Sequence, residues 1–418
     1  MDQDSTLFKI GYNTTIQFAG KTLSALLSAL SIILITRYLG VSGYGEFSLI
    51  FAYLTFFVAF TDFGLQTTIV NILSKKSFGQ AQIFGTYLTL KIFLIIGAIL
   101  LSLIVLFFLP YSGLVKAAIA FSSIGIGIGA LGGFGNTFFQ YNLRLDLTSF
   151  IDVVNRFITV ILIAVFIYLK LNFFFILSSV LISNLISILL MFIFLKKIVR
   201  FRLGFDKKIA FTLLKTSFPI GLAAYLTTAY FKLDTIMLSL FRDAREVGIY
   251  SLAYKIFENL ILIWTFYMAS FYPFLAKFYH SQNFPKFKKL LKNSVVFGFV
   301  FSISTIFLGL LLAPFLVKVF GGSQFMESIM ALRILLFAIF FACFNAILFI
   351  YLFIKNKANL ILVSLSLAFV FNFTLNLLII PRFGYIGASI TTVLTEVFIL
   401  FSYLILITKG IVKDRGLR

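Results

Sequence analysis

The sequence predicts an all-α, polytopic membrane protein with about 12 transmembrane helices in two six-helix bundles. Composition is the first observation behind this prediction, because 61% of the 418 residues are hydrophobic, 12% are charged and the mean hydropathy is +1.08. Soluble domains carry about 25% charged residues. So few polar groups cannot cover this much apolar surface in water, and a lipid bilayer is the natural solvent of the chain.

The length and order of the apolar segments are the second observation. A helix that crosses the bilayer needs about 20 apolar residues. The segments that meet this requirement lie at 14–38, 45–72, 84–109, 117–139, 150–169, 173–195, 213–241, 247–274, 294–319, 331–354, 360–380 and 385–407. They do not alternate apolar and polar residues as β-barrel strands do. The N-terminus is acidic, so we expect the first segment to be an uncleaved span rather than a signal peptide.

The distribution of basic residues is the third observation. With both termini inside the cell, 22 of the 35 Lys and Arg residues fall at the inner ends of the spans, 8 at the outer ends and 5 within spans. This asymmetry agrees with the positive-inside rule. The net charge of +21 therefore indicates membrane topology and contact with anionic lipid headgroups, and we expect no nucleic-acid partner.

An internal repeat divides the chain. The segments that begin at Gly43 and Glu246 share a Gly, an aromatic residue, a Ser and a Leu at a constant offset, and Gly45 matches Gly248. Both segments follow an odd-numbered span, so the two halves have the same orientation, as in a parallel repeat. We expect an N-terminal six-helix bundle at 1–195, a basic cytoplasmic linker at 196–212 and a C-terminal six-helix bundle at 213–418.

Catalytic and metal chemistry have little support in the sequence. The chain has one Cys, Cys343, and one His, His280. A lone Cys excludes an internal disulfide and, with a single His, a structural zinc site. The breaks between spans are too short to hold an enzyme domain. We therefore expect a transporter with no cofactor, no metal site and no catalytic residue.

Ionisable residues within the spans are the candidate functional groups, because each costs about 2.5–3.5 kcal/mol at the centre of a membrane helix. We expect the basic ones to line a water-filled cavity between the bundles and to bind an anionic substrate. They are Lys21, Lys91, Arg156, Lys232 and Lys255. We expect the acidic ones to pair with these cations, or to bind a coupling ion or proton. They are Asp62, Asp234, Glu258 and Glu396.

Internal pairing is the alternative interpretation of these charges. Lys255 and Glu258 are three residues apart, and Asp152 and Arg156 are four apart, so each pair shares a helix face. Lys232 can also extend its ammonium group toward the interface. Such pairs would stabilise the bundle without touching a substrate.

Short motifs occur along the chain in a fixed order. They are Arg37-Tyr38-Leu39-Gly40 followed by Tyr44-Gly45, Asp62-Phe63-Gly64-Leu65, Asp234 to Leu238 followed by Val247-Gly248 and Tyr250-Ser251, and Pro381 to Ala388 with Glu396. In this order they resemble the Wzx-type polysaccharide repeat-unit flippases of the multidrug/oligosaccharidyl-lipid/polysaccharide exporter superfamily. Gly40, Gly45, Gly248 and Gly384 lie at span ends, so we interpret them as turn and packing positions rather than substrate contacts.

The resemblance implies two bundles around a central cavity and movement of undecaprenyl-diphosphate-linked oligosaccharide from the inner to the outer leaflet by alternating access. It also implies the cytoplasmic membrane of a bacterium or archaeon, with membrane lipids, a polysaccharide polymerase and chain-length machinery as partners. Two alternatives stay open: a proton- or sodium-coupled exporter of small molecules from the same superfamily, and a membrane polysaccharide polymerase. Under the flippase hypothesis, replacing Lys21 and Lys91 with Ala abolishes export.

Overall fold

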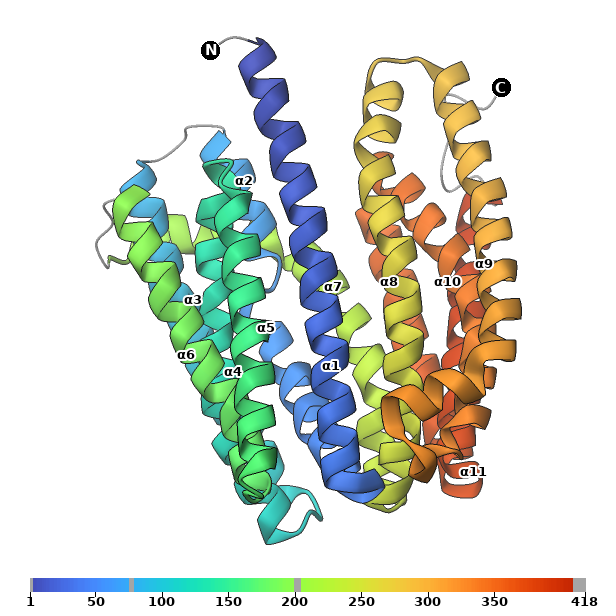
Figure 1. Ribbon diagram of the computed structural model, residues 1–418. Helices are drawn as coiled ribbons and strands as arrows, with labels where there is room; N and C mark the ends of the chain where they lie inside the picture. The colour runs from blue at the N-terminus through green and yellow to red at the C-terminus, as the bar shows by residue number, and fades with distance from the viewer. Residues whose placement is uncertain (1–2, 75–78, 199–203, 409–418) are drawn as a thin grey trace. The chain divides into compact units, whose positions relative to one another are not determined.

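The computed structural model describes residues 3–74, 79–198 and 204–408, and every regular element in these ranges is a helix (Figure 1). In chain order the elements are α1 (Gln3–Val58), η1 (Ala59–Thr61), α2 (Leu65–Ser74), α3 (Gln80–Phe108), α4 (Gly113–Tyr141), α5 (Leu145–Tyr168), α6 (Phe173–Ile198), α7 (Lys207–Phe241), α8 (Ala244–His280), α9 (Phe284–Gly321), η2 (Ser323–Phe325), α10 (Ser328–Ile354) and α11 (Ala358–Thr408). Part of the predicted linker, with Arg200 and Arg202, lies outside the described residues, as do Lys75, Lys76 and the basic residues after Thr408.

Length and hydropathy identify most of these helices as membrane spans. Within the described residues, nine helices are long and apolar enough to cross a membrane, or ten if the bent helix α7 is one span. The first of the nine runs from Ala19 in α1 to Thr61 at the end of η1, and the last coincides with α11. Both α1 and α11 consist of two helices merged at a kink, at Gly40 and Gly384 respectively. Helix α1 therefore contains the first predicted span and the beginning of the second, and α11 contains the last two. The prediction of an all-α polytopic membrane protein is confirmed.

The last helix, α11, folds back on itself at Gly384. Thr391 donates a hydrogen bond to Asn376 Oδ1 at 2.6 Å, and Ser402 donates to Ser364 Oγ at 2.8 Å. Residues at similar distances from Gly384 along the chain thus lie opposite each other, as in two antiparallel helices. Gly384 has φ 54°, in a region that glycine adopts without the steric cost of a Cβ atom. Its predicted role as a turn residue is confirmed.

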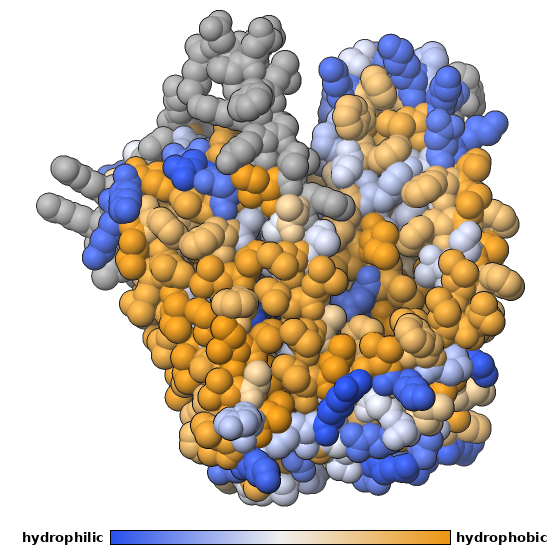
Figure 2. Space-filling view, in the orientation of Figure 1, coloured by the Kyte–Doolittle hydropathy of each residue, from blue (hydrophilic) through white to orange (hydrophobic). Residues whose placement is uncertain are grey.

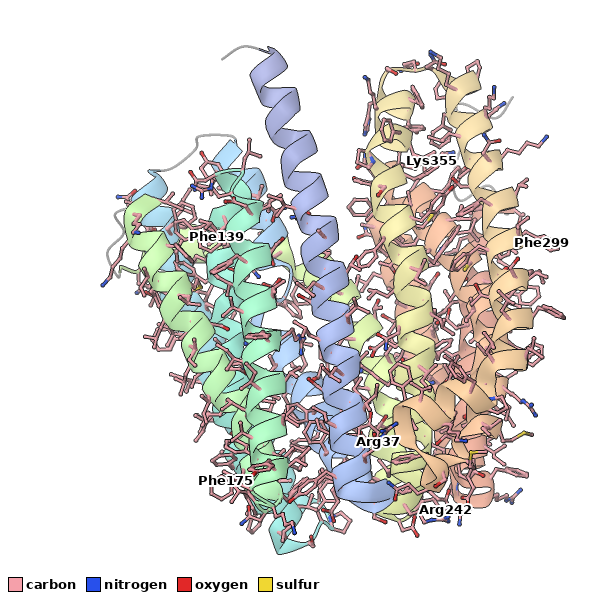
Figure 3. All side chains as sticks on the ribbon, in the orientation of Figure 1. Arg37, Phe139, Phe175, Arg242, Phe299 and Lys355 are labelled. Carbon is pink, nitrogen blue, oxygen red and sulfur yellow. The ribbon has the colours of Figure 1, made fainter. Side chains whose placement is uncertain are left out.

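The turn at Gly384 is anchored by residues at the junction of α7 and α8. The Glu246 carboxylate accepts a hydrogen bond from the Tyr385 backbone N–H at 3.0 Å. Arg242, labelled in Figure 3, donates to the Pro381 carbonyl at 2.9 Å and lies 3.7 Å from Glu246. The motif that begins at Pro381 therefore has a structural explanation in this turn.

The chain forms two compact units. The first comprises Met1–Gly40 and Ile50–Tyr225, and the second comprises Val41–Leu49 and Leu226–Arg418. The core of the first unit includes buried side chains of α2, α3, α4 and α6, among them the stacked rings of Phe84 and Phe138. In the second unit α10 packs against α8, α9 and α11, and Trp264 donates to the Cys343 carbonyl at 3.2 Å. The predicted six-helix bundles and linker stay a prediction.

The two copies of the repeated segment contact each other in the second unit. A Cβ atom on Gly45 would collide with the backbone of Ala244 and Gly248, and one on Gly248 would collide with that of Val41 and Gly45. The contact is reciprocal, because Val41 and Ala244 are themselves equivalent in the repeat. Reciprocal contacts between equivalent residues are typical of segments related by a two-fold axis. The predicted packing role of Gly45 and Gly248 is therefore confirmed.

Apolar side chains cover the middle of the helices, and hydrophilic side chains gather near the helix ends (Figure 2). Phe175 in the first unit and Phe299 in the second, both labelled in Figure 3, are 44% and 53% exposed. Contiguous exposed apolar surface of this kind is rare on soluble proteins and normal for helices that face lipid.

Candidate functional site

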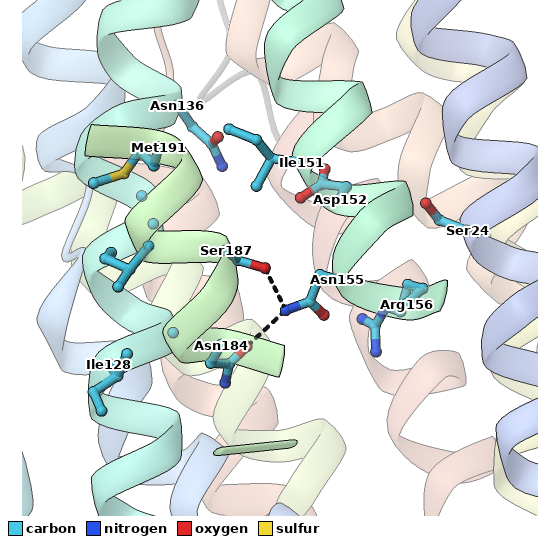
Figure 4. Close-up of a pocket in the computed structure, with 14 residues that line it drawn as sticks. Ser24, Ile128, Asn136, Ile151, Asp152, Asn155, Arg156, Asn184, Ser187 and Met191 are labelled. Carbon is cyan, nitrogen blue, oxygen red and sulfur yellow. Dashed lines mark hydrogen bonds between the residues drawn. The ribbon is translucent and has the colours of Figure 1, made fainter. Parts of the chain in front are cut away.

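A polar cavity of about 340 Å³ lies among α1, α4, α5 and α6 of the first unit (Figure 4). The residues that line it are Ser24, Ile128, Gly129, Gly132, Gly133, Asn136, Ile151, Asp152, Asn155, Arg156, Asn184, Ser187, Ile188 and Met191. Polar and charged side chains outnumber apolar ones, although the four helices are otherwise strongly apolar. Polar groups are costly inside a membrane, so this grouping indicates a site for a polar ligand.

Amide side chains form one wall of the cavity, and hydrogen bonds hold them in place. Asn155 of α5 donates to Asn184 Oδ1 at 3.0 Å and to Ser187 Oγ at 2.9 Å, both on α6 (Figure 4). Asn184 in turn donates to the Gly125 carbonyl of α4 at 2.9 Å. These bonds link three helices and fix the orientation of the amides, which present both donors and acceptors to a bound molecule.

The charged side of the cavity is formed by α5 and α1. Asp152 and Arg156 both line the cavity, but they form no ion pair within 4 Å in the part of the chain that the structure describes. Lys21 and Arg156 both lie within electrostatic range of Asp152. Lys21 is three residues before Ser24, which lines the cavity from α1, so the two share a helix face. The structure thus brings predicted residues Lys21 and Arg156 to one region.

Lys91 lies behind the wall of this cavity. Its Nζ is 3.3 Å from Asp62 Oδ1, and 2% of the Lys91 side chain is exposed compared with 44% of the Asp62 side chain. A Cβ atom on Gly133, which lines the cavity, would lie 3.3 Å from this Nζ. Lys91 is therefore paired and buried, and only a glycine separates its charge from the cavity.

A break in the second predicted span presents the Asp62 carboxylate. η1 ends at Thr61, and Phe63 and Gly64 both have positive φ values, 38° and 73°, before α2 begins at Leu65. The Leu65 N–H donates to the Asp62 carbonyl at 2.7 Å, which closes the turn. The predicted motif at Asp62 to Leu65 therefore corresponds to a helix interruption within the membrane region, a feature that many transporters place beside polar sites.

In the second unit, Lys232 and Lys255 share the carboxylate of Glu258. The Nζ atom of Lys255 lies 2.7 Å from Glu258 Oε2, and that of Lys232 lies 3.5 Å from Oε1. Lys232 also lies over the ring of Tyr254, 5.6 Å from its centroid. The predicted pairing of Lys255 with Glu258 is confirmed. Two ammonium groups against one carboxylate leave this group with a net positive charge.

Asp234 lies in the second unit and is 1% exposed. Four neutral side chains donate to its carboxylate: Tyr250 at 3.0 Å, Thr392 at 2.6 Å, Asn372 at 3.1 Å and Asn376 at 2.6 Å. The amide oxygens of Asn372 and Asn376 also accept hydrogen bonds within the cluster. Four donors to one carboxylate stabilise its charged form and offset part of the cost of its burial.

Glu396 is the second buried carboxyl group of this unit and is 2% exposed. Its Oε1 accepts a hydrogen bond from Tyr230 at 3.1 Å, and its Oε2 accepts one from Asn345 Nδ2 at 2.7 Å. Asp234 and Glu396 thus differ from Asp62 and Glu258, which pair with lysines. Within the described residues, no group of three or more His, Cys, Asp or Glu side chains is placed to hold a metal ion.

Sequence comparison identifies the family. Residues 10–279 match the polysaccharide biosynthesis protein family, and this match covers more than half of the chain. The chain belongs to the polysaccharide biosynthesis protein family. Residues 219–378 also match the MatE family. This family agrees with the resemblance that the motifs indicate.

Solved structures share the fold of this family member along nearly its whole length. The lipid II flippase MurJ in an inward closed conformation matches with a TM-score of 0.77 and 17% identity, over 94% of this chain and 87% of that one. An inward-facing multidrug resistance MATE transporter matches with a TM-score of 0.73 and 14% identity, over 96% and 100% of the two chains. A transporter of the same superfamily from Pyrococcus furiosus matches with a TM-score of 0.68 and 16% identity, over 97% of this chain and 96% of that one.

A relative in sequence is the uncharacterized membrane protein MJ1068 of Methanocaldococcus jannaschii. It is 30% identical over 179 residues, which make up 42% of this chain and 34% of the relative. The match therefore spans about a third of the relative's length. It is consistent with a multi-pass membrane protein.

Sequence reasoning missed the amide residues of this family member. Asn136, Asn155 and Asn184 line the cavity, and Asn372 and Asn376 hold Asp234. A signal was present, because asparagine inside an apolar span carries the same kind of desolvation cost as a charge, though a smaller one. The prediction considered only ionisable residues and therefore did not include these asparagines.

Proposed function

We propose that this protein flips oligosaccharides linked to undecaprenyl diphosphate from the inner to the outer leaflet, by alternating access, for cell-surface polysaccharide synthesis. The observation that carries the proposal is the polar cavity of the first unit, where Arg156, Asp152 and three asparagines meet inside apolar helices. Membership of the polysaccharide biosynthesis family supports the same cargo class.

The chemistry of the cavity suits a glycan attached to a diphosphate. Guanidinium and ammonium groups bind phosphate oxygens by charge-assisted hydrogen bonds, so Arg156 and Lys21 are the proposed diphosphate contacts. Asn136, Asn155 and Asn184 offer the paired donors and acceptors that sugar hydroxyl groups need. The apolar surface of the surrounding helices allows the lipid tail to remain in the bilayer during transfer.

The remaining predicted cations contribute charge rather than direct contacts in this proposal. Lys91 is buried against Asp62 and acts on the cavity through Gly133. Lys232 and Lys255 keep a net positive charge around Glu258 in the second unit. A positive field of this kind concentrates an anionic headgroup before it binds.

The direct test is the appearance of glycan on the far side of proteoliposomes loaded with a lipid-linked oligosaccharide. The proposal predicts protein-dependent exposure, which an externally added lectin detects, and its loss in the double variant Lys21→Ala and Lys91→Ala. Equal exposure with wild type, with the double variant and with empty liposomes would contradict it. Size-exclusion chromatography of the purified double variant checks that it is folded and not aggregated.

An ion-coupled exporter of small molecules is the second candidate, because residues 219–378 match the MatE family and the second unit holds two buried carboxyl groups. Uptake of a cationic dye under an ion gradient, without glycan movement, would favour it. If the protein were instead a polysaccharide polymerase, new glycosidic bonds would form in the same vesicles. A flippase would leave the glycan unchanged.

The proposed location is the cytoplasmic membrane of a bacterium or archaeon, with both termini inside. A linker at 196–212 is proposed to join two six-helix bundles. The proposed downstream partners are a polymerase and its chain-length machinery.

Cys343 is the single cysteine of the chain. Replacing it with Ser therefore gives a background in which single cysteines in each loop report the side of the membrane. Labelling of position 3 from outside intact cells would contradict this topology.

A further inference from the structure

The hydrogen bonds around Asn155 determine which of its polar atoms are left for a ligand in the cavity of the first unit. Asn184 Nδ2 donates to the Gly125 carbonyl. Ser187 Oγ donates to the Ser183 carbonyl at 2.8 Å. Asn184 Oδ1 and Ser187 Oγ therefore act as acceptors, and Asn155 Nδ2 donates to both of them. Both N–H bonds of the Asn155 amide are used, and its Oδ1 lies on the side away from Asn184 and Ser187 (Figure 4). Asn155 thus offers a ligand an acceptor and no side-chain donor.

Asp152 adds a carboxylate next to this acceptor. It lies three residues before Asn155 on α5, so the two side chains share a helix face, and both line the cavity. Among the described residues, the Asp152 carboxylate receives no hydrogen bond and forms no ion pair within 4 Å. A carboxylate offers acceptors only. This face of α5 therefore presents both Asp152 oxygens and Asn155 Oδ1 to a ligand as acceptors.

The charged donors of the region lie close to this acceptor face. Arg156 follows Asp152 by four residues on α5, Lys21 is on α1, and both are within electrostatic range of Asp152. The proposed function places the diphosphate of the cargo at these two cations. The sugar that is joined to the diphosphate then lies next to the acceptors of Asp152 and Asn155. Hydroxyl and N–H groups of the sugar can donate to them, whereas a carboxylate on the sugar would meet acceptors and a like charge.

We propose that Asp152 and Asn155 select the glycan of the cargo, and that the sugar next to the diphosphate carries hydrogen-bond donors and no carboxylate. The substrate class is thus a glycan that begins with a neutral hexose or an N-acetylated hexosamine rather than with a uronic acid. The assignment rests on the proposed function, because it takes the diphosphate to be held by Arg156 and Lys21. A site of fixed acceptors rejects a ligand without matching donors, since its polar groups are then left unpaired.

Calorimetric titration of the purified full-length protein in nanodiscs tests the selection without any flipping assay. The three ligands are farnesyl diphosphate, farnesyl diphosphate linked to N-acetylglucosamine, and farnesyl diphosphate linked to glucuronic acid. The wild-type protein is expected to bind the N-acetylglucosamine ligand at least about tenfold more tightly than the glucuronic acid ligand. In Asp152→Asn the two affinities are expected to differ by no more than about twofold, because the amide has a donor and no charge. Asp146→Asn is the matched control on the same helix and should keep the wild-type preference, because Asp146 pairs with Arg144.

Asp152→Ser provides a second variant if Asp152→Asn does not fold, and it should lose the preference as well. Equal affinities in wild type, tighter binding of the glucuronic acid ligand, or a preference that survives in both variants would overturn the proposal. If farnesyl diphosphate binds to wild type and not to Arg156→Ala, but the sugars are not distinguished, the selection is wrong and the proposed diphosphate site stands. If none of the three ligands binds, the diphosphate site is wrong, and the selection is wrong with it.

Discussion

The polar groups of the two units are built in opposite ways. The first unit has a polar cavity in which Arg156 and Asp152 form no ion pair among the described residues, and the amides that line it are fixed by their neighbours. The second unit buries two carboxyl groups, Asp234 and Glu396, and neighbouring side chains donate hydrogen bonds to both. A cavity lined by charged and amide groups can bind a polar ligand, whereas buried carboxylates held by hydrogen bonds stabilise the fold.

The largest expected effect is on stability and comes from removing the buried carboxylate of Asp234. Asp234→Ala removes the acceptor that Tyr250, Thr392, Asn372 and Asn376 share, and a hydrogen bond to a charged group contributes about 1.5–3 kcal/mol. We expect a loss of at least about 3 kcal/mol in unfolding free energy, measured by thermal unfolding in detergent. Asp234→Asn keeps one acceptor and should lose less. Equal stability of Asp234→Ala and wild type would remove the contrast between the units.

The next effect concerns the open cavity and should appear in transport rather than in stability. A hydrogen bond to a charged group contributes about 1.5–3 kcal/mol, so Arg156→Ala is expected to lower the flipping rate by roughly ten- to a hundredfold. Arg144→Ala is the matched control, because Arg144 pairs with Asp146 at the exposed start of α5. If both variants flip at the wild-type rate, Arg156 does not contact the cargo.

A smaller effect on the flipping rate tests whether the Lys91–Asp62 ion pair contributes separately from the cavity. Gly133→Ala places a methyl group about 3.3 Å from Lys91 Nζ, whereas Gly132→Ala meets nothing within 4 Å, although both residues line the cavity. We expect Gly133→Ala to slow flipping severalfold and Gly132→Ala to be close to wild type, in the same lectin assay. Identical slowing would mean that cavity volume matters, and not the position of Lys91.

The smallest effect is expected for the lysine pair of the second unit. Lys255, Lys232 and Glu258 have side chains that are 24–42% exposed, and ion pairs of this kind contribute about 0.2–1 kcal/mol. Glu258→Gln should therefore lower the midpoint of thermal unfolding by only a few degrees. A loss as large as that of Asp234→Ala would show that this group belongs to the buried network.

The sequence predicts the helices well because each apolar run must be long enough to cross a bilayer. It also predicts the contact of Lys255 with Glu258, since three residues along one helix determine their separation. The turn at Gly384 and the close approach of Gly45 to Gly248 follow from glycines at span ends. All of these features depend on local spacing.

Features that bring distant segments together could not be predicted in the same way. The cavity requires Asn136, Asn155 and Asn184 to converge from three helices. The pairing of Lys91 with Asp62 depends on a helix break whose positive φ values no hydropathy pattern encodes. Their geometry therefore comes from the structure alone.

Binding of the anionic headgroup by the cavity of the first unit is the step on which the proposed function depends. Native mass spectrometry of the purified protein with undecaprenyl diphosphate tests it directly, with Arg156→Ala and Arg144→Ala measured at matched lipid concentrations. We expect at least about tenfold weaker binding to Arg156→Ala, which is the effect of losing about 1.4 kcal/mol, and unchanged binding to Arg144→Ala. Equal lipid binding by wild type and Arg156→Ala would show that Arg156 does not hold the headgroup.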